Sequence, residues 1–159
     1  LPVLARDVLS IGAEGLGVMM ALRSIGGILA ILALSAVTEI KRQGLLYLVV
    51  LHVFAASLFL LAYADTLYLA MVAILLINGM GALSDILSQS LIQTTVPDGM
   101  RGRAMGSWVV AVGWGPIGHL QIGALASGFG VSIALFTHGF GLLVLAVAAI
   151  MIVPKLRNM

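Results

Sequence analysis

Five long apolar stretches, separated by short polar connections, constrain this chain more than any other feature of its sequence. A helix needs about 20 predominantly apolar residues to cross the hydrocarbon core of a bilayer. In chain order the stretches run over about 15–37, 45–63, 67–91, 104–126 and 131–153. We therefore predict an all-α membrane protein, a polytopic bundle of transmembrane helices.

The composition supports the same conclusion. Of the 159 residues, 62% are hydrophobic and 9% are charged, and the mean hydropathy is +1.19. A soluble domain carries roughly a quarter charged residues, and a chain of this size has too little interior to bury so much apolar surface. We expect the lipid bilayer to be a partner. The net charge of +2, without a basic stripe interleaved with aromatics, does not indicate nucleic-acid binding.

The sequence shows no sign of an enzyme, a cofactor or a metal site. It contains no cysteine, no serine with readable triad partners, and no P-loop lysine after the glycines of 12–17. Three histidines, His52, His119 and His138, fall inside predicted spans without metal-ligand spacing. We interpret each histidine as a hydrogen-bonded packing residue.

The first residues indicate a piece of a longer protein. The chain starts at Leu1 rather than at a methionine, and no signal-peptide pattern precedes it. We interpret residues 1–9 as the end of an earlier helix and expect an N-terminal part to be missing.

Positive charges are unevenly distributed between the two sets of alternate connections, which lie on opposite sides of the membrane. The predicted connections are 5–14, 38–44, 64–66, 97–103 and 127–130, followed by the tail 154–159. One side carries Lys41, Arg42, Arg101, Arg103, Lys155 and Arg157, whereas the other carries Arg6. By the positive-inside rule the first side, with the C-terminus, is cytoplasmic.

Arg23 and a stripe on the third span are the informative polar groups within the spans. An arginine at mid-helix costs roughly 3 kcal/mol to insert, so Arg23 should face the bundle or a water-filled cavity. Its role is open between substrate or counter-ion contact and a structural ion pair. Asn78, Asp85, Ser88 and Gln89, with Gln93 a turn further on, share one helical face that we expect to point inward.

Asp85 is the one acid well inside a predicted span. Either it binds a coupling proton or contacts substrate, or it serves as a structural cap or pairs with Arg101 or Arg103. Pairing with Arg23 is disfavoured because the two residues lie toward opposite ends of oppositely directed helices.

The fourth span is rich in glycine and contains Pro116. Gly102 and Gly106 have the four-residue spacing that lets membrane helices approach closely. Pro116 should kink the span, either as a fixed bend or as a hinge that moves. Trp108 is expected to anchor the helix at the cytoplasmic interface, and Trp114 lies deeper, where it can line a substrate path.

Two motifs in this region resemble a known family. The run Gln93–Gly106, with Val96-Pro97-Asp98 and Arg101-Gly102-Arg103, resembles the loop between the tenth and eleventh helices of the major facilitator superfamily. Trp114-Gly115-Pro116-Ile117-Gly118-His119 resembles the middle of its eleventh helix. The similarity, with that of the opening residues 1–9, is to the bacterial drug and siderophore exporter branch.

The resemblance implies the second six-helix half of a twelve-helix transporter in the bacterial inner membrane. Residues 1–159 then hold the last five helices and the end of the one before, and the missing N-terminal half is a partner. The implied function is secondary active, proton-coupled efflux of small amphipathic molecules. It places Arg23, Asn78, Asp85 and Trp114 in positions that can bind substrate or an ion, and Gln89 of the polar stripe is a further candidate.

The resemblance also implies a set of gating residues. They are Glu39, Lys41, Arg42, Asp98, Arg101, Gly102, Arg103 and Pro116. The loop 38–44 keeps the acid and bases of the family's gate motif without its full pattern. The alternative function is a non-transporting membrane scaffold or assembly subunit, which predicts a gene no longer than this chain.

Overall fold

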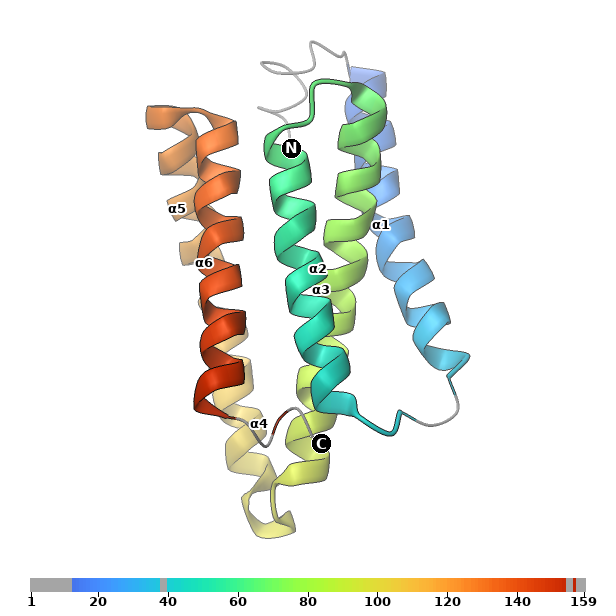
Figure 1. The fold of residues 1–159 in the computed structure, drawn as a ribbon, viewed down its shortest axis with the longest axis vertical. Helices are drawn as coiled ribbons and strands as arrows, with labels where there is room; N and C mark the ends of the chain where they lie inside the picture. The colour runs from blue at the N-terminus through green and yellow to red at the C-terminus, as the bar shows by residue number, and fades with distance from the viewer. Residues whose placement is uncertain (1–12, 38–39, 154–155, 157–159) are drawn as a thin grey trace.

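The computed structural model describes residues 13–37, 40–153 and 156, and every regular element in them is helical (Figure 1). The helices are α1 (Ala13–Ser35), α2 (Gln43–Ala62), α3 (Leu67–Thr95), α4 (Asp98–Gly113), α5 (Gly115–Phe129) and α6 (Val131–Ile152). Within these described residues, five spans are long and apolar enough to cross a membrane, with α4 and α5 together forming the fourth. The predicted all-α polytopic bundle is confirmed.

Consecutive spans are antiparallel. The α2–α3 and α5–α6 turns lie at one end of the bundle, whereas the α3–α4 turn lies at the other, with the start of α2 (Figure 1). Lys41, Arg42, Arg101 and Arg103 therefore lie toward the same end, as the charge pattern requires. Lys155 and Arg157, as well as residues 1–9 and Glu39, lie outside the described residues.

Small residues bring the helix backbones close together. α3 packs against both α1 and α2, and α2 packs in turn against α6. A Cβ atom on Gly26 of α1 would collide with the backbone carbonyl of Leu75 on α3, and one on Gly79 would lie 3.1 Å from the Gly26 carbonyl oxygen. A Cβ atom on Gly139 of α6 would lie 3.2 Å from the Cβ atom of Leu58 on α2. Such close approach strengthens van der Waals packing, which holds helices together where lipid removes the hydrophobic drive.

Large apolar side chains lie mainly on the outside of the bundle. Many of the buried hydrophobic residues are alanines, and the largest fully buried side chains are Met19, Ile74 and Leu87. Exposed large apolar residues include Ile28 and Leu32 on α1, Leu120 on α5 and Leu145 on α6. This distribution is the one expected of helices surrounded by hydrocarbon.

The predicted loop 97–103 is wrong beyond its first residue, because α4 begins at Asp98. Pro97 is the N-cap, and the carboxylate of Asp98 in the first turn interacts favourably with the helix dipole. The turn predicted over 127–130 is also shorter and reduces to Gly130, whose φ of 90° favours glycine. The third span, predicted to end at about residue 91, continues to Thr95.

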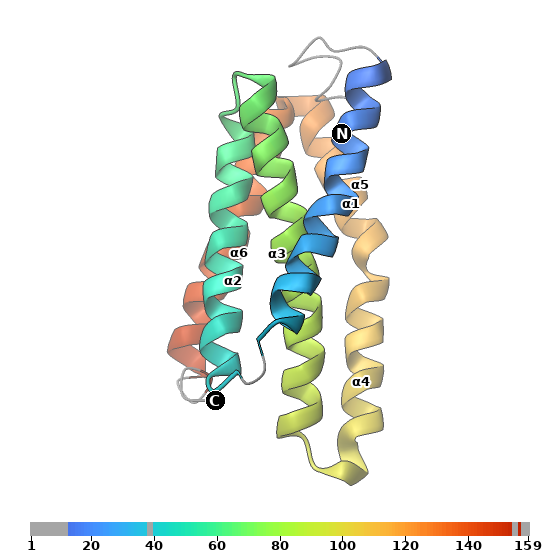
Figure 2. The same ribbon diagram turned by 90° about the vertical axis from the view of Figure 1, so that its right-hand side faces the viewer.

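The fourth span is interrupted at Trp114, between α4 and α5, which lie end to end (Figure 2). Pro116 lies in the first turn of α5, where its missing N–H costs no internal hydrogen bond. The close approach expected at Gly102 and Gly106 is absent within the described part of the chain, where nothing lies within 4 Å of a Cβ atom at either position. Gly26 and Gly79 provide that close approach instead.

Candidate functional site

A cavity of about 460 Å³ lies among five of the six helices, α1, α2, α3, α5 and α6. Its wall is mostly aliphatic, with three polar side chains. The lining residues are Arg23, Leu58, Leu61, Ile74, Ile77, Asn78, His119, Ile122, Gly123, Ala126, Val131, Ala134 and Leu135. A concave, mainly apolar site with a few convergent polar groups is typical of small-molecule binding.

Arg23 and Asn78 come together on this wall from α1 and α3. Asn78 is half-buried, and its Nδ2 donates to the carbonyl oxygen of Ile74 at 2.8 Å. That bond, made within the helix, fixes the side-chain orientation. No aspartate or glutamate is among the lining residues, all of which are described, so Arg23 supplies the formal charge of the cavity wall.

His119 is the lining residue that sequence reasoning missed. It lies on α5 three residues after Pro116, and it is exposed rather than packed. His52 behaves as the packing interpretation requires, because its Nδ1 lies 2.7 Å from the Leu48 carbonyl oxygen. No signal in the sequence separated His119 from the two other histidines, which were interpreted in the same way.

Asp85, Gln89 and Trp114 lie away from this cavity. Asp85 is exposed, and its backbone carbonyl accepts bonds from Ser88 Oγ at 2.9 Å and Gln89 Nε2 at 3.3 Å. Asp85 forms no ion pair with Arg23, Arg101 or Arg103, all four being described residues. Trp114, 63% exposed, sits at the break between α4 and α5. The polar residues of α3 therefore lie in two different regions, and of these residues only Asn78 lines the cavity.

Trp108 joins α4 to α3. Its indole Nε1 donates to Ser88 Oγ at 3.3 Å, one turn from Asp85 on α3. Trp108 therefore makes a specific contact between helices, in addition to any role at the membrane interface.

Six of the predicted gating residues lie at or just before the starts of α2 and α4, whereas Pro116 lies in α5. Arg101 pairs with Asp98 at 2.7 Å, and its Nε donates to the Val96 carbonyl oxygen at 3.2 Å. Gly102 and Arg103 are exposed in the same turns of α4, and Lys41 and Arg42 are exposed just before α2. The Asp98–Arg101 pair spans three residues of one helix, so it fastens the α3–α4 turn and does not bridge distant elements.

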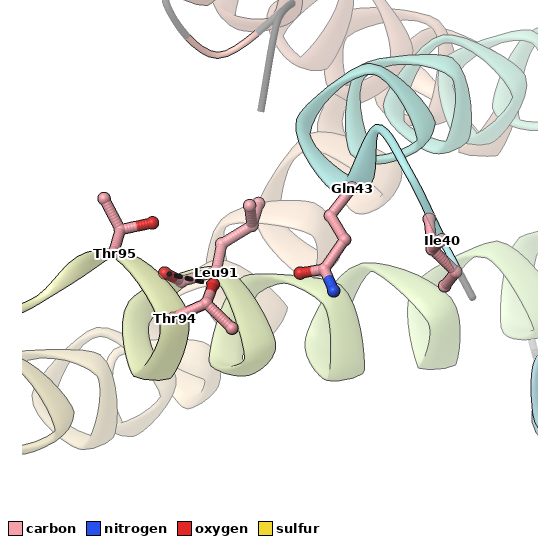
Figure 3. Close-up of a pocket in the computed structure, with 5 residues that line it drawn as sticks. All are labelled: Ile40, Gln43, Leu91, Thr94 and Thr95. Atoms are coloured by element: carbon pink, nitrogen blue, oxygen red, sulfur yellow. Dashed lines mark hydrogen bonds between the residues drawn. The ribbon is translucent and has the colours of Figure 1, made fainter. Parts of the chain in front are cut away.

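A smaller pocket, of about 310 Å³, lies between the start of α2 and the end of α3 (Figure 3). Ile40, Gln43, Leu91, Thr94 and Thr95 line it. Two of its polar groups already have partners, since Gln43 Oε1 accepts from Ser90 Oγ at 3.1 Å and Thr94 Oγ1 donates to the Ser90 carbonyl oxygen at 2.9 Å. We interpret it as a packing groove.

The comparisons with known proteins agree with the architecture. The family described as transmembrane secretion effector, a branch of the major facilitator superfamily, matches residues 1–159. This chain belongs to that family. Within the described residues, no group of three histidine, aspartate or glutamate side chains is placed to hold a metal ion.

Individual relatives point in the same direction. The chain is 27% identical over 158 residues to the enterobactin exporter EntS of Escherichia coli K12 and to that of Shigella flexneri. It is 28% identical to the enterobactin exporter of Escherichia coli O1:K1 / APEC. Each alignment covers 99% of this chain and 38% of the relative, so the chain spans about two fifths of those proteins. No solved structure matches the chain.

Proposed function

We propose that residues 1–159 are the C-terminal half of a proton-coupled exporter of small amphipathic molecules, of the drug or siderophore type. The chain would lie in the bacterial inner membrane with its C-terminus in the cytoplasm, and the missing N-terminal half would complete the transport path. Family membership and the exporter relatives support a transporter rather than an enzyme.

The cavity among the helices carries this proposal. Its aliphatic wall suits the apolar body of a small molecule, while Arg23, Asn78 and His119 provide hydrogen-bond donors that orient a polar end. An arginine in a membrane helix is costly unless it serves a pathway or a partner, which favours a functional reason for its place on this wall.

Conformational change would use the break at Trp114. α4 has no buried residue, so it can move relative to α5 without disrupting a packed core. The exposed Arg101, Gly102 and Arg103 at its start, with Lys41 and Arg42 before α2, remain proposed gating residues. Asp85 remains the proposed coupling acid, and Gln89 and Trp114 would act on the path outside the cavity.

The test uses the full-length protein in energised everted membrane vesicles, with fluorescent amphipathic dyes and enterobactin as substrates. Gly123→Leu should fill the cavity, because a Cβ atom at Gly123 meets nothing within 4 Å and the residue lines the wall. Gly141→Leu on α6 is the matched control, since its Cβ position is equally free and lies outside the cavity lining.

We expect Gly123→Leu to abolish export at unchanged protein level, while Gly141→Leu retains it. Equal export by both variants would show that the cavity is not part of the transport path. If the wild-type protein moves none of the substrates, and the gene encodes no more than this chain, the scaffold alternative is favoured.

A further inference from the structure

We propose that the cavity recognises the anionic end of an amphipathic molecule, with Arg23, His119 and Asn78 as the recognising groups. This inference rests on the proposed function, and it names the chemical class of the substrate.

The charge of the wall is the first observation. Arg23 contributes a guanidinium group to the wall. The other lining residues include no acid to neutralise it. Arg23 is exposed at this wall, so its charge is accessible to an anion that enters the cavity and attracts it.

The hydrogen-bonding capacity of the wall is the second observation. Guanidinium presents a planar set of donors that matches carboxylate, phosphate or sulfonate oxygens. His119 and Asn78 add ring N–H and amide N–H donors from two other helices. One Asn78 N–H already bonds to Ile74, which leaves the second available for a ligand. Donors converging from α1, α3 and α5 form a site that no single helix provides.

The apolar wall then fixes the shape of the ligand. Leu58, Leu61, Ile74 and Ile77 come from α2 and α3, and Ile122 and Leu135 come from α5 and α6. The molecule that fits is therefore an organic anion with an aliphatic or aromatic body, and not a free inorganic ion.

The absence of cysteine from the chain permits a direct measurement of the cavity's potential. Gly123→Cys is introduced into full-length protein, with any cysteine of the remaining half replaced by serine. The protein is reconstituted in phosphatidylcholine vesicles. The rates of modification by a sulfonate-bearing and an ammonium-bearing methanethiosulfonate reagent are compared. Ser127→Cys, one turn further along α5 and exposed at its end, corrects for intrinsic reagent reactivity.

We expect the corrected sulfonate-to-ammonium rate ratio of the Gly123→Cys protein to exceed one. Adding Arg23→Gln should lower this rate ratio about tenfold, because losing a positive charge from the same cavity wall slows the sulfonate reagent and speeds the ammonium reagent. Arg23→Lys should keep most of the ratio, and Asn78→Asp should lower it in a background that retains Arg23. The Lys and Asp variants keep the test informative if Arg23→Gln does not fold.

Three results would overturn the proposal. One is a ratio at or below one, and the second is a ratio unchanged by both Arg23→Gln and Asn78→Asp. The third is a Gly123→Cys protein that reacts with neither reagent while the Ser127→Cys protein reacts with both. If the Gly123→Cys thiol is protected only when phosphatidylglycerol is added, the site binds a lipid headgroup. The assignment of an anionic substrate would then be wrong. Labelling needs no transport, so a positive cavity in a protein that exports nothing contradicts the proposed function alone.

Discussion

The indole Nε1 of Trp108 on α4 donates a hydrogen bond to the hydroxyl of Ser88 on α3, at 3.3 Å. α3 and α4 are consecutive helices joined by a short turn, and α4 buries no residue of its own. This bond is therefore one specific restraint on where α4 lies against α3.

Removing the Ser88 hydroxyl should loosen α4 with little loss of global stability. A typical net hydrogen bond contributes about 1 kcal/mol, so Ser88→Ala should increase hydrogen exchange of α4 amides several-fold. Ser107→Ala is the control, because Ser107 Oγ bonds only to the Ala104 carbonyl of its own helix. Equal exchange in the two variants would show that the contact does not restrain α4.

Gly26→Ala should destabilise the protein, although alanine is the better helix former. Its Cβ atom would collide with the Leu75 backbone carbonyl, which cannot rotate away as a side chain can. We expect a net loss of about 1–3 kcal/mol, the usual cost of overpacking, measured as a lower Tm in detergent. Gly17→Ala on the same helix meets nothing within 4 Å and should hold or raise the Tm. A Tm equal to that of Gly17→Ala would contradict the close α1–α3 packing.

The spans were predictable from the sequence because hydrocarbon thickness and apolar run length are linked directly. The sequence did not predict which helices pack against the small residues. The four-residue spacing at Gly102 and Gly106 suggested close packing, yet the close approach is made by Gly26 and Gly79, which lie on different helices. Sequence spacing describes one helix face, whereas packing depends on which helix lies opposite that face.

The candidate site was predictable in part for the same reason. The cost of placing Arg23 and Asn78 in hydrocarbon indicated inward positions, and both line the cavity. Asp85 shares a helix face with Asn78 by periodicity, but lies about two turns further along α3, beyond the cavity. His119 was missed because a single histidine in an apolar span gives no signal until the helices around it are placed.

Pro116→Ala should stabilise the fourth span while slowing export. The substitution restores an N–H at the start of α5 and removes the restriction that proline places on Gly115, which favours one continuous helix through Trp114. We expect an unchanged or higher Tm together with an export rate reduced several-fold in vesicles. Gly118→Ala, whose Cβ position is free, controls for altered helix propensity. Full export by Pro116→Ala would mean that the break is a fixed bend.

Arg101 should matter for transport more than for stability. Its pair with Asp98 is exposed, and such pairs contribute about 0.2–1 kcal/mol, so Arg101→Gln should change the Tm little. If the α3–α4 turn takes part in gating, export falls at least tenfold in the same variant. Arg101→Lys distinguishes charge from geometry, because lysine cannot bond the Asp98 carboxylate and the Val96 carbonyl with the same planar group. Export unaffected by either substitution would exclude a gating role.

Asp85→Asn should uncouple export from the proton gradient. Asp85 is exposed on α3, and its backbone carbonyl accepts a bond from the Ser88 hydroxyl that also binds Trp108, so Asp85 lies one turn from the contact between α3 and α4. We expect proteoliposomes with Asp85→Asn to lose acceleration by an imposed pH gradient while keeping downhill substrate exchange. Asp65→Asn, in the exposed turn before α3, is the matched control and should respond to pH as the wild type does. Retention of pH-driven export in Asp85→Asn would assign the coupling site to another residue of the full-length protein.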